Sequence, residues 1–153
     1  MQFSATHDLK LAQDDLFKRL SDFEYFEKLA QEKGLNLECT AGNSGPPAVG
    51  MSWHANFRLA GKDRQISTTL VEMASPDKMQ FEFSSPNING RSTVTLDPLS
   101  QTQTRMSVDI ELEPQTLSAR LFVQSLKLAR AQANKRFQER ISRLASYLEN
   151  QAV

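Results

Sequence analysis

The chain has 153 residues, of which 39% are hydrophobic and 24% charged, and this balance is typical of one globular domain rather than a disordered chain. Its 18 basic and 18 acidic side chains cancel, so no overall charge attracts nucleic acid or a membrane surface. The one cysteine excludes an internal disulfide and a zinc site made of several cysteines.

The first part of the chain predicts a short strand followed by two short helices. Phe3 and Ala5 alternate with polar residues, as in a strand that buries one face. Between residues 12 and 33, apolar residues recur at helical spacing in two groups, and Ser21 or Asp22 would cap the second group. Gly34 would end this helix, because glycine readily adopts the left-handed conformation that follows a helix.

Five or six strands are expected next, joined by turns, and such a series of hairpins predicts an antiparallel sheet. The clearest strand places Met51, Trp53, Ala55, Phe57 and Leu59 on an apolar face, alternating with polar residues. The chain turns back at Gly61 and Lys62, and we expect Arg64 to lie opposite Leu59 and Thr68 opposite Ala55. Further strands are expected at residues 35–40, 79–83, 94–96 and 106–112.

Residues 116–149 predict one long helix, because they contain neither glycine nor proline. Its apolar stripe consists of Ala119, Phe122, Val123, Leu126, Ala129, Ala133, Phe137, Ile141, Leu144 and Leu148. On the opposite side, Leu117, Leu121 and Leu128 form a second apolar face. We expect loops and the short helices to cover these leucines, and a homodimer contact is the alternative.

The predicted order is therefore a strand, two short helices, several strands and a long helix. A sheet with one apolar face must cover that face, and the long helix is the element that can do so. A strongly bent sheet cannot contact a straight helix along its whole length, so we expect a gap at one end.

This order and several local patterns resemble the SRPBCC superfamily, also called START-like, which includes lipid-transfer domains, polyketide cyclases and plant pollen allergens. The patterns lie at residues 16–26, 49–53, 61–62, 71–79 and 121–126. The resemblance implies one α+β domain over residues 1–150 with the helix-grip fold. In this fold a curved antiparallel sheet of six or seven strands wraps around one long C-terminal helix, and two short helices follow the first strand.

The resemblance also implies a central apolar cavity for a hydrophobic or amphipathic small molecule, such as a lipid, isoprenoid, quinone or polyketide. No active residue is carried over, because the chemistry of the superfamily varies and no catalytic motif matches. The candidate lining residues are Trp53, Ala55, Phe57, Arg64, Thr68, Phe81, Phe83, Met106, Phe122, Leu126, Arg130 and Ala133. The alternative interpretation of these residues is ordinary core packing.

Arg130 falls on the apolar stripe of the long helix, where a charge must reach water, an acid or a ligand head group. It would anchor a carboxylate or phosphate of an amphiphile, reach solvent at the stripe edge, or pair with an inward acid such as Glu72. Arg64, Thr68 and Glu72 point inward only if the strand pairing is as predicted. An inward Glu72 would also suit a cyclase or hydratase that uses this carboxylate as general base.

No metal or cofactor site is expected. His7 and His54 have no metal-binding partner at a useful spacing, and Cys39 is expected to be a small buried side chain. The sequence contains no phosphate loop and no dinucleotide-binding motif.

The expected partner is a hydrophobic small molecule, and a ligand-free module that binds another protein is the further alternative. Residues 116–149 carry seven basic and two acidic side chains. This positive charge could bind an anionic lipid surface or nucleic acid. The interpretation that we favour is a helix face exposed to solvent. Nucleic acid is not expected, because aromatic residues do not interleave with the basic ones. We expect no stable membrane insertion and a cytoplasmic location, since long apolar runs and export signals are both lacking.

Overall fold

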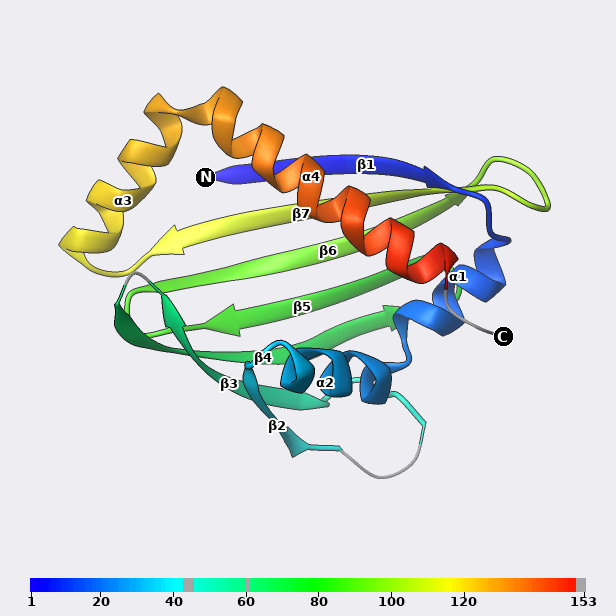
Figure 1. Cartoon of the computed structure of the whole chain (residues 1–153), viewed down its shortest axis with the longest axis horizontal. Helices are drawn as coiled ribbons and strands as arrows, with labels where there is room; N and C mark the ends of the chain where they lie inside the picture. Colours follow the sequence, from blue (N-terminus) through cyan, green and yellow to red (C-terminus); the bar gives the residue numbers. More distant parts are fainter. Residues whose placement is uncertain (43–45, 60, 151–153) are drawn as a thin grey trace.

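The computed structural model describes residues 1–42, 46–59 and 61–150, and these form seven strands and four helices (Figure 1). The elements are β1 (Gln2–Leu9), α1 (Gln13–Leu20), α2 (Phe23–Glu32), β2 (Asn36–Ala41), β3 (Ser52–Leu59), β4 (Lys62–Ala74), β5 (Lys78–Ser84), β6 (Ile88–Pro98), β7 (Thr104–Pro114), α3 (Leu117–Leu128) and α4 (Arg130–Glu149). This arrangement confirms the α+β helix-grip class that the order of elements predicts.

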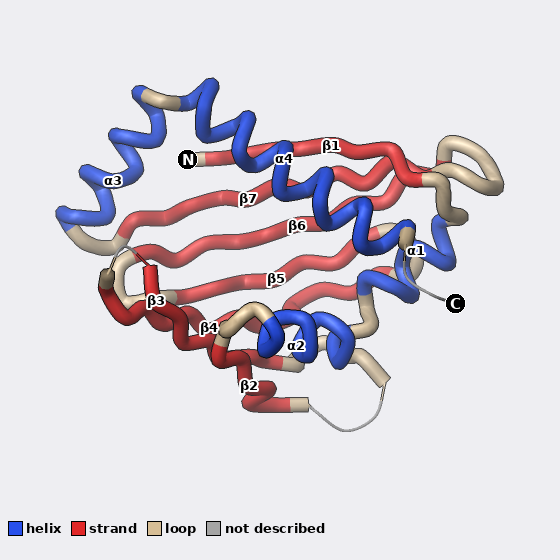
Figure 2. Tube along the Cα trace, viewed as in Figure 1, coloured by secondary structure: helices blue, strands red, loops and turns tan. Residues whose placement is uncertain are grey.

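The strands form a single antiparallel sheet in the order β1-β7-β6-β5-β4-β3-β2. All neighbours except β1 and β7 follow one another in the sequence, so most of the sheet is a series of hairpins. The exception joins the first strand to the last, with Phe3 opposite Ile110 and Ala5 opposite Val108. The helices lie on one face of the sheet, where α4 crosses β1 and α2 lies beside β2 (Figure 2).

The second short helix begins and ends where its sequence signals predict. The Asp22 side chain accepts a hydrogen bond from the Tyr25 amide at 3.3 Å and caps α2. At the other end, Gly34 has a φ of 82°, which lets the Leu35 amide bond to the Ala30 carbonyl at 2.9 Å. This geometry satisfies a carbonyl that the helix would otherwise leave without a partner.

The buried core gathers at one end of the helix-covered face, which we call the packed end. Its fully buried side chains are Leu9, Leu16, Leu70, Met106 and Leu148, contributed by strands β1, β4 and β7 and helices α1 and α4. Thr104 is also fully buried, and its hydroxyl donates to the Leu11 carbonyl at 2.8 Å. The packed end is therefore closed by α1 and the last turns of α4.

The β3–β4 hairpin differs in register from the sequence prediction. Arg64 lies opposite Phe57 and Leu59 pairs with Lys62, because the turn is tighter than expected. The shift is two residues, so each side chain keeps the face that the alternation predicts. Arg64 and Thr68 therefore belong to the same face as Trp53.

The predicted single helix over residues 116–149 is divided into α3 and α4. Ala129 has φ −104° and ψ 33°, which lie outside helical values, although its amide still bonds to the Ser125 carbonyl at 3.1 Å. The chain bends because α3 packs at the end of β7, whereas α4 packs along β1. A straight rod could not make both contacts.

Candidate functional site

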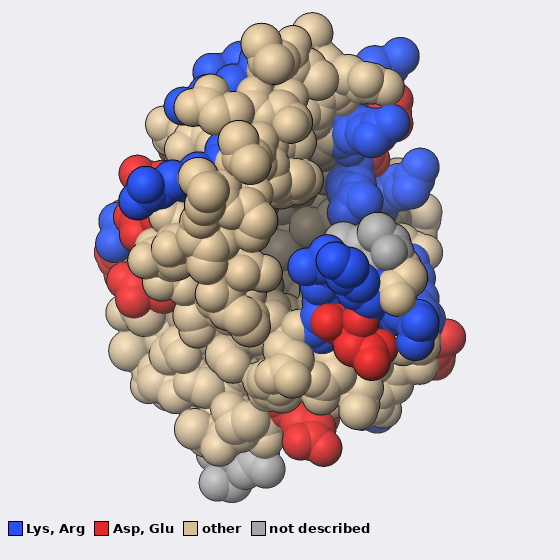
Figure 3. Space-filling model, turned by 90° about the vertical axis from the view of Figure 1, so that its left-hand side faces the viewer, with Lys and Arg blue, Asp and Glu red and all other residues tan. Residues whose placement is uncertain are grey.

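The opposite end of the same sheet face is only partly covered, and we call it the open end. Phe57, Ile66, Phe83 and Leu112 point to the side of the core by strand alternation, but they are half-buried and lie outside the buried cluster. Figure 3 views the molecule from this end and shows that its surface is hollowed. Lys and Arg side chains gather along one side of the hollow (Figure 3). The open end thus offers apolar surface beside positive charge.

Three aromatic rings pack α2 against the sheet. Phe23 of α2 makes edge contacts with Trp53 and Phe81, with ring centroids 5.0 and 6.1 Å apart. The indole Nε1 of Trp53 donates to the Glu27 carboxylate at 2.8 Å, which fixes α2 to β3. Trp53 is the sole tryptophan of the chain, so it is a natural fluorescent reporter for this contact.

Arg64 brings a charge to the apolar side of the sheet. It lies opposite Phe57 and next to Ile66 on the inward face. Its Nε atom is shielded from solvent and has no hydrogen-bond partner among the residues described. An unpaired buried donor costs about 1–3 kcal/mol. Arg64 as a whole is half-buried, so other atoms of the residue are still exposed on this face. Arg64 therefore places a positive charge with an unpartnered donor on the half-covered apolar face.

The structure brings most of the predicted lining residues to one sheet face. Those on the strands are Trp53, Ala55, Phe57, Arg64, Thr68, Phe81, Phe83 and Met106. Trp53 is 5% exposed and Met106 is fully buried, so both belong to the packed core, whereas the other six are half-buried. Leu126 of α3 and Ala133 of α4 are half-buried as well.

Neither Phe122 nor Arg130 lines the sheet face; for Phe122 this corrects the prediction, and for Arg130 it matches the alternative in which the side chain reaches solvent. Phe122 is 52% exposed, and Arg130 is exposed with a hydrogen bond of 3.4 Å from its Nη2 to the Gln2 carbonyl. The predicted stripe assumes a straight helix, whereas the chain bends at Ala129 between α3 and α4. Arg130 thus reaches solvent at the edge of the stripe.

The predicted inward placement of Glu72 is also wrong. Leu70 lies opposite Phe81 and Glu72 lies opposite Gln80, so β4 has one residue more than β5 in this interval. This bulge turns Glu72 to the outer face, where its carboxylate lies 3.3 Å from the Lys78 ammonium. A general base for a ligand in the hollow would have to lie on the inward face of the sheet. A cyclase or hydratase that uses Glu72 is therefore excluded.

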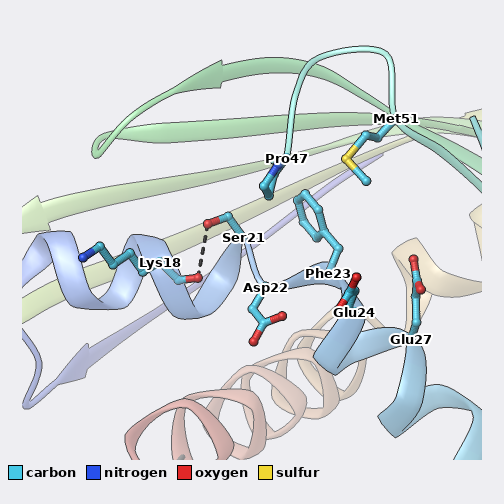
Figure 4. Close-up of a pocket in the computed structure, with 8 residues that line it drawn as sticks. All are labelled: Lys18, Ser21, Asp22, Phe23, Glu24, Glu27, Pro47 and Met51. Carbon is cyan, nitrogen blue, oxygen red and sulfur yellow. Dashed lines mark hydrogen bonds between the residues drawn. The ribbon is translucent and has the colours of Figure 1, made fainter. Parts of the chain in front are cut away.

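A second hollow of about 400 Å³ lies where α1 meets α2, beside the segment before β3. Its lining residues are Lys18, Ser21, Asp22, Phe23, Glu24, Glu27, Pro47 and Met51. Figure 4 shows the Phe23 ring pointing toward Pro47 and Met51. The sequence analysis missed this hollow, because helical periodicity does not place residues 46–51 over α2. The sequence feature that could have indicated this hollow is the group of three carboxylates at Asp22, Glu24 and Glu27.

An ion pair marks the outer face at the other edge of the sheet. Arg105 Nε donates to the Asp8 carboxylate at 2.9 Å. This hydrogen bond, opposed by desolvation, holds the pKa of Asp8 below its ordinary value, and it raises the pKa of Arg105. Within the described ranges, no three His, Cys, Asp or Glu side chains are grouped so that they could hold a metal ion.

Comparisons with known proteins agree with this architecture. The family model described as polyketide cyclase/dehydrase and lipid transport matches residues 1–149. Truncated norcoclaurine synthase from Thalictrum flavum superposes with a TM-score of 0.71 at 12% identity, over 100% of this chain and 95% of that one. The ZhuI aromatase/cyclase from Streptomyces sp. R1128 gives 0.66 at 10% identity, over 96% and 94%. These likenesses show the fold alone.

A START superfamily protein from Mycobacterium smegmatis is similar in the same way. Its TM-score is 0.58 at 18% identity, and the match covers 94% of this chain and 98% of that protein. Among curated protein sequences, none matches this chain. Of the helices described, none has both the length and the apolar composition that crossing a bilayer requires.

Proposed function

The chain belongs to the polyketide cyclase/dehydrase and lipid transport family, and from this premise we propose that it binds an amphipathic small molecule at the open end of its sheet. The match over residues 1–149 confirms the SRPBCC membership expected from the sequence. The observation that carries the proposal is the shielded, unpartnered Nε of Arg64 on a half-covered apolar face.

The apolar part of the ligand would lie on the open end. Phe57, Ile66, Phe83 and Leu112 are half-buried, so each keeps apolar surface that a ligand would remove from water. Such burial contributes roughly 25 cal/mol per Å² before the costs of association are subtracted. Aromatic and branched side chains accept several ligand shapes, which suits a lipid, isoprenoid, quinone or polyketide.

The polar part of the ligand would meet Arg64. A guanidinium binds carboxylate or phosphate oxygens through parallel hydrogen bonds, which are stronger than those between neutral groups. The half-buried Ala55, Thr68, Phe81, Leu126 and Ala133 would complete the site, with Trp53 and Met106 as its buried floor. We therefore expect an amphiphile with an anionic end to bind more tightly than its neutral counterpart.

The test compares palmitate with cetyl alcohol, which have the same chain length and differ at the head group. Each is titrated into the protein while the fluorescence of Trp53 is recorded. We expect palmitate to bind at least about tenfold more tightly, because a hydrogen bond to a charged group is worth about 1.5–3 kcal/mol. Arg64→Gln should remove this preference and leave the binding of the alcohol unchanged.

The matched control is Arg91→Gln, on the outer face of β6. Arg91 is exposed and its guanidinium lies 3.5 Å from the Glu82 carboxylate, so this variant removes an arginine on the other side of the sheet. It should keep the preference for palmitate. The proposal is wrong if neither compound binds, or if Arg64→Gln binds palmitate as tightly as the unchanged protein does.

A further inference from the structure

Helix α3 exposes a ridge of leucines that no described part of the chain covers. Leu117, Leu121 and Leu128 are 74%, 62% and 92% exposed, which overturns the expectation that loops or short helices cover them. At about 100° per residue, these three positions lie within about 40° of one another around the helix. They face away from Ala119 and Val123, which are buried against the protein. The ridge is therefore the outward side of a helix whose inward side is already packed.

The position of α3 leaves this ridge accessible from the end of the molecule. Its main contacts are with β7 and α4, and its buried residues Ala119 and Val123 lie outside the central hydrophobic cluster. Figure 1 shows α3 at the same end as the turn between β5 and β6, away from α1. An apolar ridge at the rim of a molecule can meet a flat surface without obstruction by the sheet.

The charges of α3 indicate the chemistry of that surface. The helix contains Arg120 and Lys127 and no acidic residue, and α4 continues with Arg130. By helical geometry, Arg120 and Lys127 lie on the same flank, about 80–100° from the centre of the ridge. Leucines on one face with basic side chains beside them are typical of a helix that lies in the interface of a bilayer.

We propose that α3 docks the protein on the surface of bilayers that contain anionic lipids. Leu117, Leu121 and Leu128 enter the interface between head groups and acyl chains, while Arg120 and Lys127 contact the lipid phosphates. This inference rests on the ridge and its charges, and it holds whether or not a ligand binds beside Arg64. Docking of one short helix is peripheral and reversible.

A second copy of the chain is a poorer occupant of the ridge. Two α3 helices packed on each other would bring their basic residues together without an acidic partner on either helix. The helix has 12 residues, so one face is about 18 Å long and about 10 Å wide. Its area of about 200 Å² is well below the roughly 800 Å² per partner that a stable dimer buries. Charge and area therefore both favour a lipid surface.

The test is co-sedimentation of the full chain with vesicles of phosphatidylcholine alone or mixed with phosphatidylglycerol. We expect binding only to the anionic vesicles, and weaker binding as salt is added. The variant with Leu121→Gln and Leu128→Gln should bind at least about tenfold less, because each leucine side chain loses its burial in the bilayer. Arg120→Gln and Lys127→Gln should each weaken binding about fivefold.

The matched control is Leu99→Gln, which changes another exposed leucine (44%) in the turn between β6 and β7. It should bind anionic vesicles as the unchanged chain does, and all variants should unfold at the same temperature. The proposal is overturned if the unchanged chain does not bind anionic vesicles, or if the double leucine variant binds equally well. It is also overturned if sedimentation without lipid shows a dimer that the double variant abolishes.

The test also separates this inference from the proposed function. Arg64→Gln should bind anionic vesicles normally, and the double leucine variant should still prefer palmitate in the Trp53 assay. A protein that fails the vesicle test but prefers palmitate would overturn the docking role of α3 alone.

Discussion

The packed end and the open end are built from the same strands with the same alternation of side chains, yet only one of them is closed. At the packed end, Leu9, Leu70 and Met106 are completely buried beneath α1 and the last turns of α4. At the open end, Phe83 and Leu112 point to the same side but stay half-exposed, because the chain bends at Ala129 and α3 turns away. Alternation thus determines the side on which a residue lies, and the helices determine whether it is covered.

The largest expected contrast comes from the same substitution at the two ends. Leu148→Ala at the packed end should lower the free energy of unfolding by about 2–5 kcal/mol, since a fully buried leucine leaves a cavity. Leu112→Ala at the open end should cost only about 1 kcal/mol, because that side chain is already half in water. Urea unfolding followed by circular dichroism measures both. Equal losses would mean that the open end is packed as firmly as the core.

A glycine tests whether the open end is loose throughout. A methyl group on Gly90 would meet the Phe83 ring and the Glu111 carbonyl, because Phe83 lies directly over this glycine. Gly90→Ala should therefore destabilise the fold by about 1–3 kcal/mol despite its place at the open end. Thermal unfolding measures the loss, with Ser92→Ala, the next inward position on β6, as control. If Gly90→Ala left the unfolding temperature unchanged, the strands around this position would have to shift to make room for the methyl group.

The contact between α2 and the sheet depends on one hydrogen bond. Trp53→Phe removes the donor to Glu27 and should destabilise the fold by about 1 kcal/mol or more. Glu27→Gln keeps an acceptor oxygen and should cost less, and the double variant should cost little more than Trp53→Phe. A double-mutant cycle from urea unfolding measures the coupling. Additive losses would mean that this bond does not hold α2 on the sheet.

The smallest expected effect depends on pH and lies on the outer face near the packed end. Because the Arg105 hydrogen bond lowers the pKa of Asp8, the ionised carboxylate stabilises the fold above the ordinary pKa, and this contribution is lost as pH falls through the lowered value. Asp8→Asn should be slightly less stable at pH 7 and equal to the unchanged chain once the pH lies below the lowered pKa of Asp8. Raised salt should shrink the difference, since both side chains are partly exposed. Thermal unfolding measures it, with Asp97→Asn, which lies across from Arg105 without this hydrogen bond, as the control.

The sequence predicted the sheet faces well because the alternation of a strand has a fixed period. Trp53, Ala55 and Phe57 lie on one face as expected, and Arg64 keeps its side although the hairpin register is shifted by two residues. The prediction for Glu72 was wrong because a bulge depends on how two strands pair, and nothing in the sequence of β4 alone marks the extra residue.

Local sequence patterns could not predict the helix bend or the second hollow. Residues 126–133 contain no helix breaker, so the break at Ala129 is imposed by where β7 ends and where β1 lies. The exposure of Phe122 follows from that bend. The hollow between α1 and α2 depends on the path of residues 46–51, which their proline and glycine content does not specify.

The pairing of β1 with β7 has a consequence for how the protein is made. Phe3 cannot pair until Ile110 has been made, about 100 residues later. Helix α4, which covers β1, is made later still. At about 5–20 residues per second, the first strand is made roughly 5–20 s before its sheet neighbour β7. The hairpins from β2 to β6 can form during that interval, so the pairing of β1 with β7 closes the sheet last.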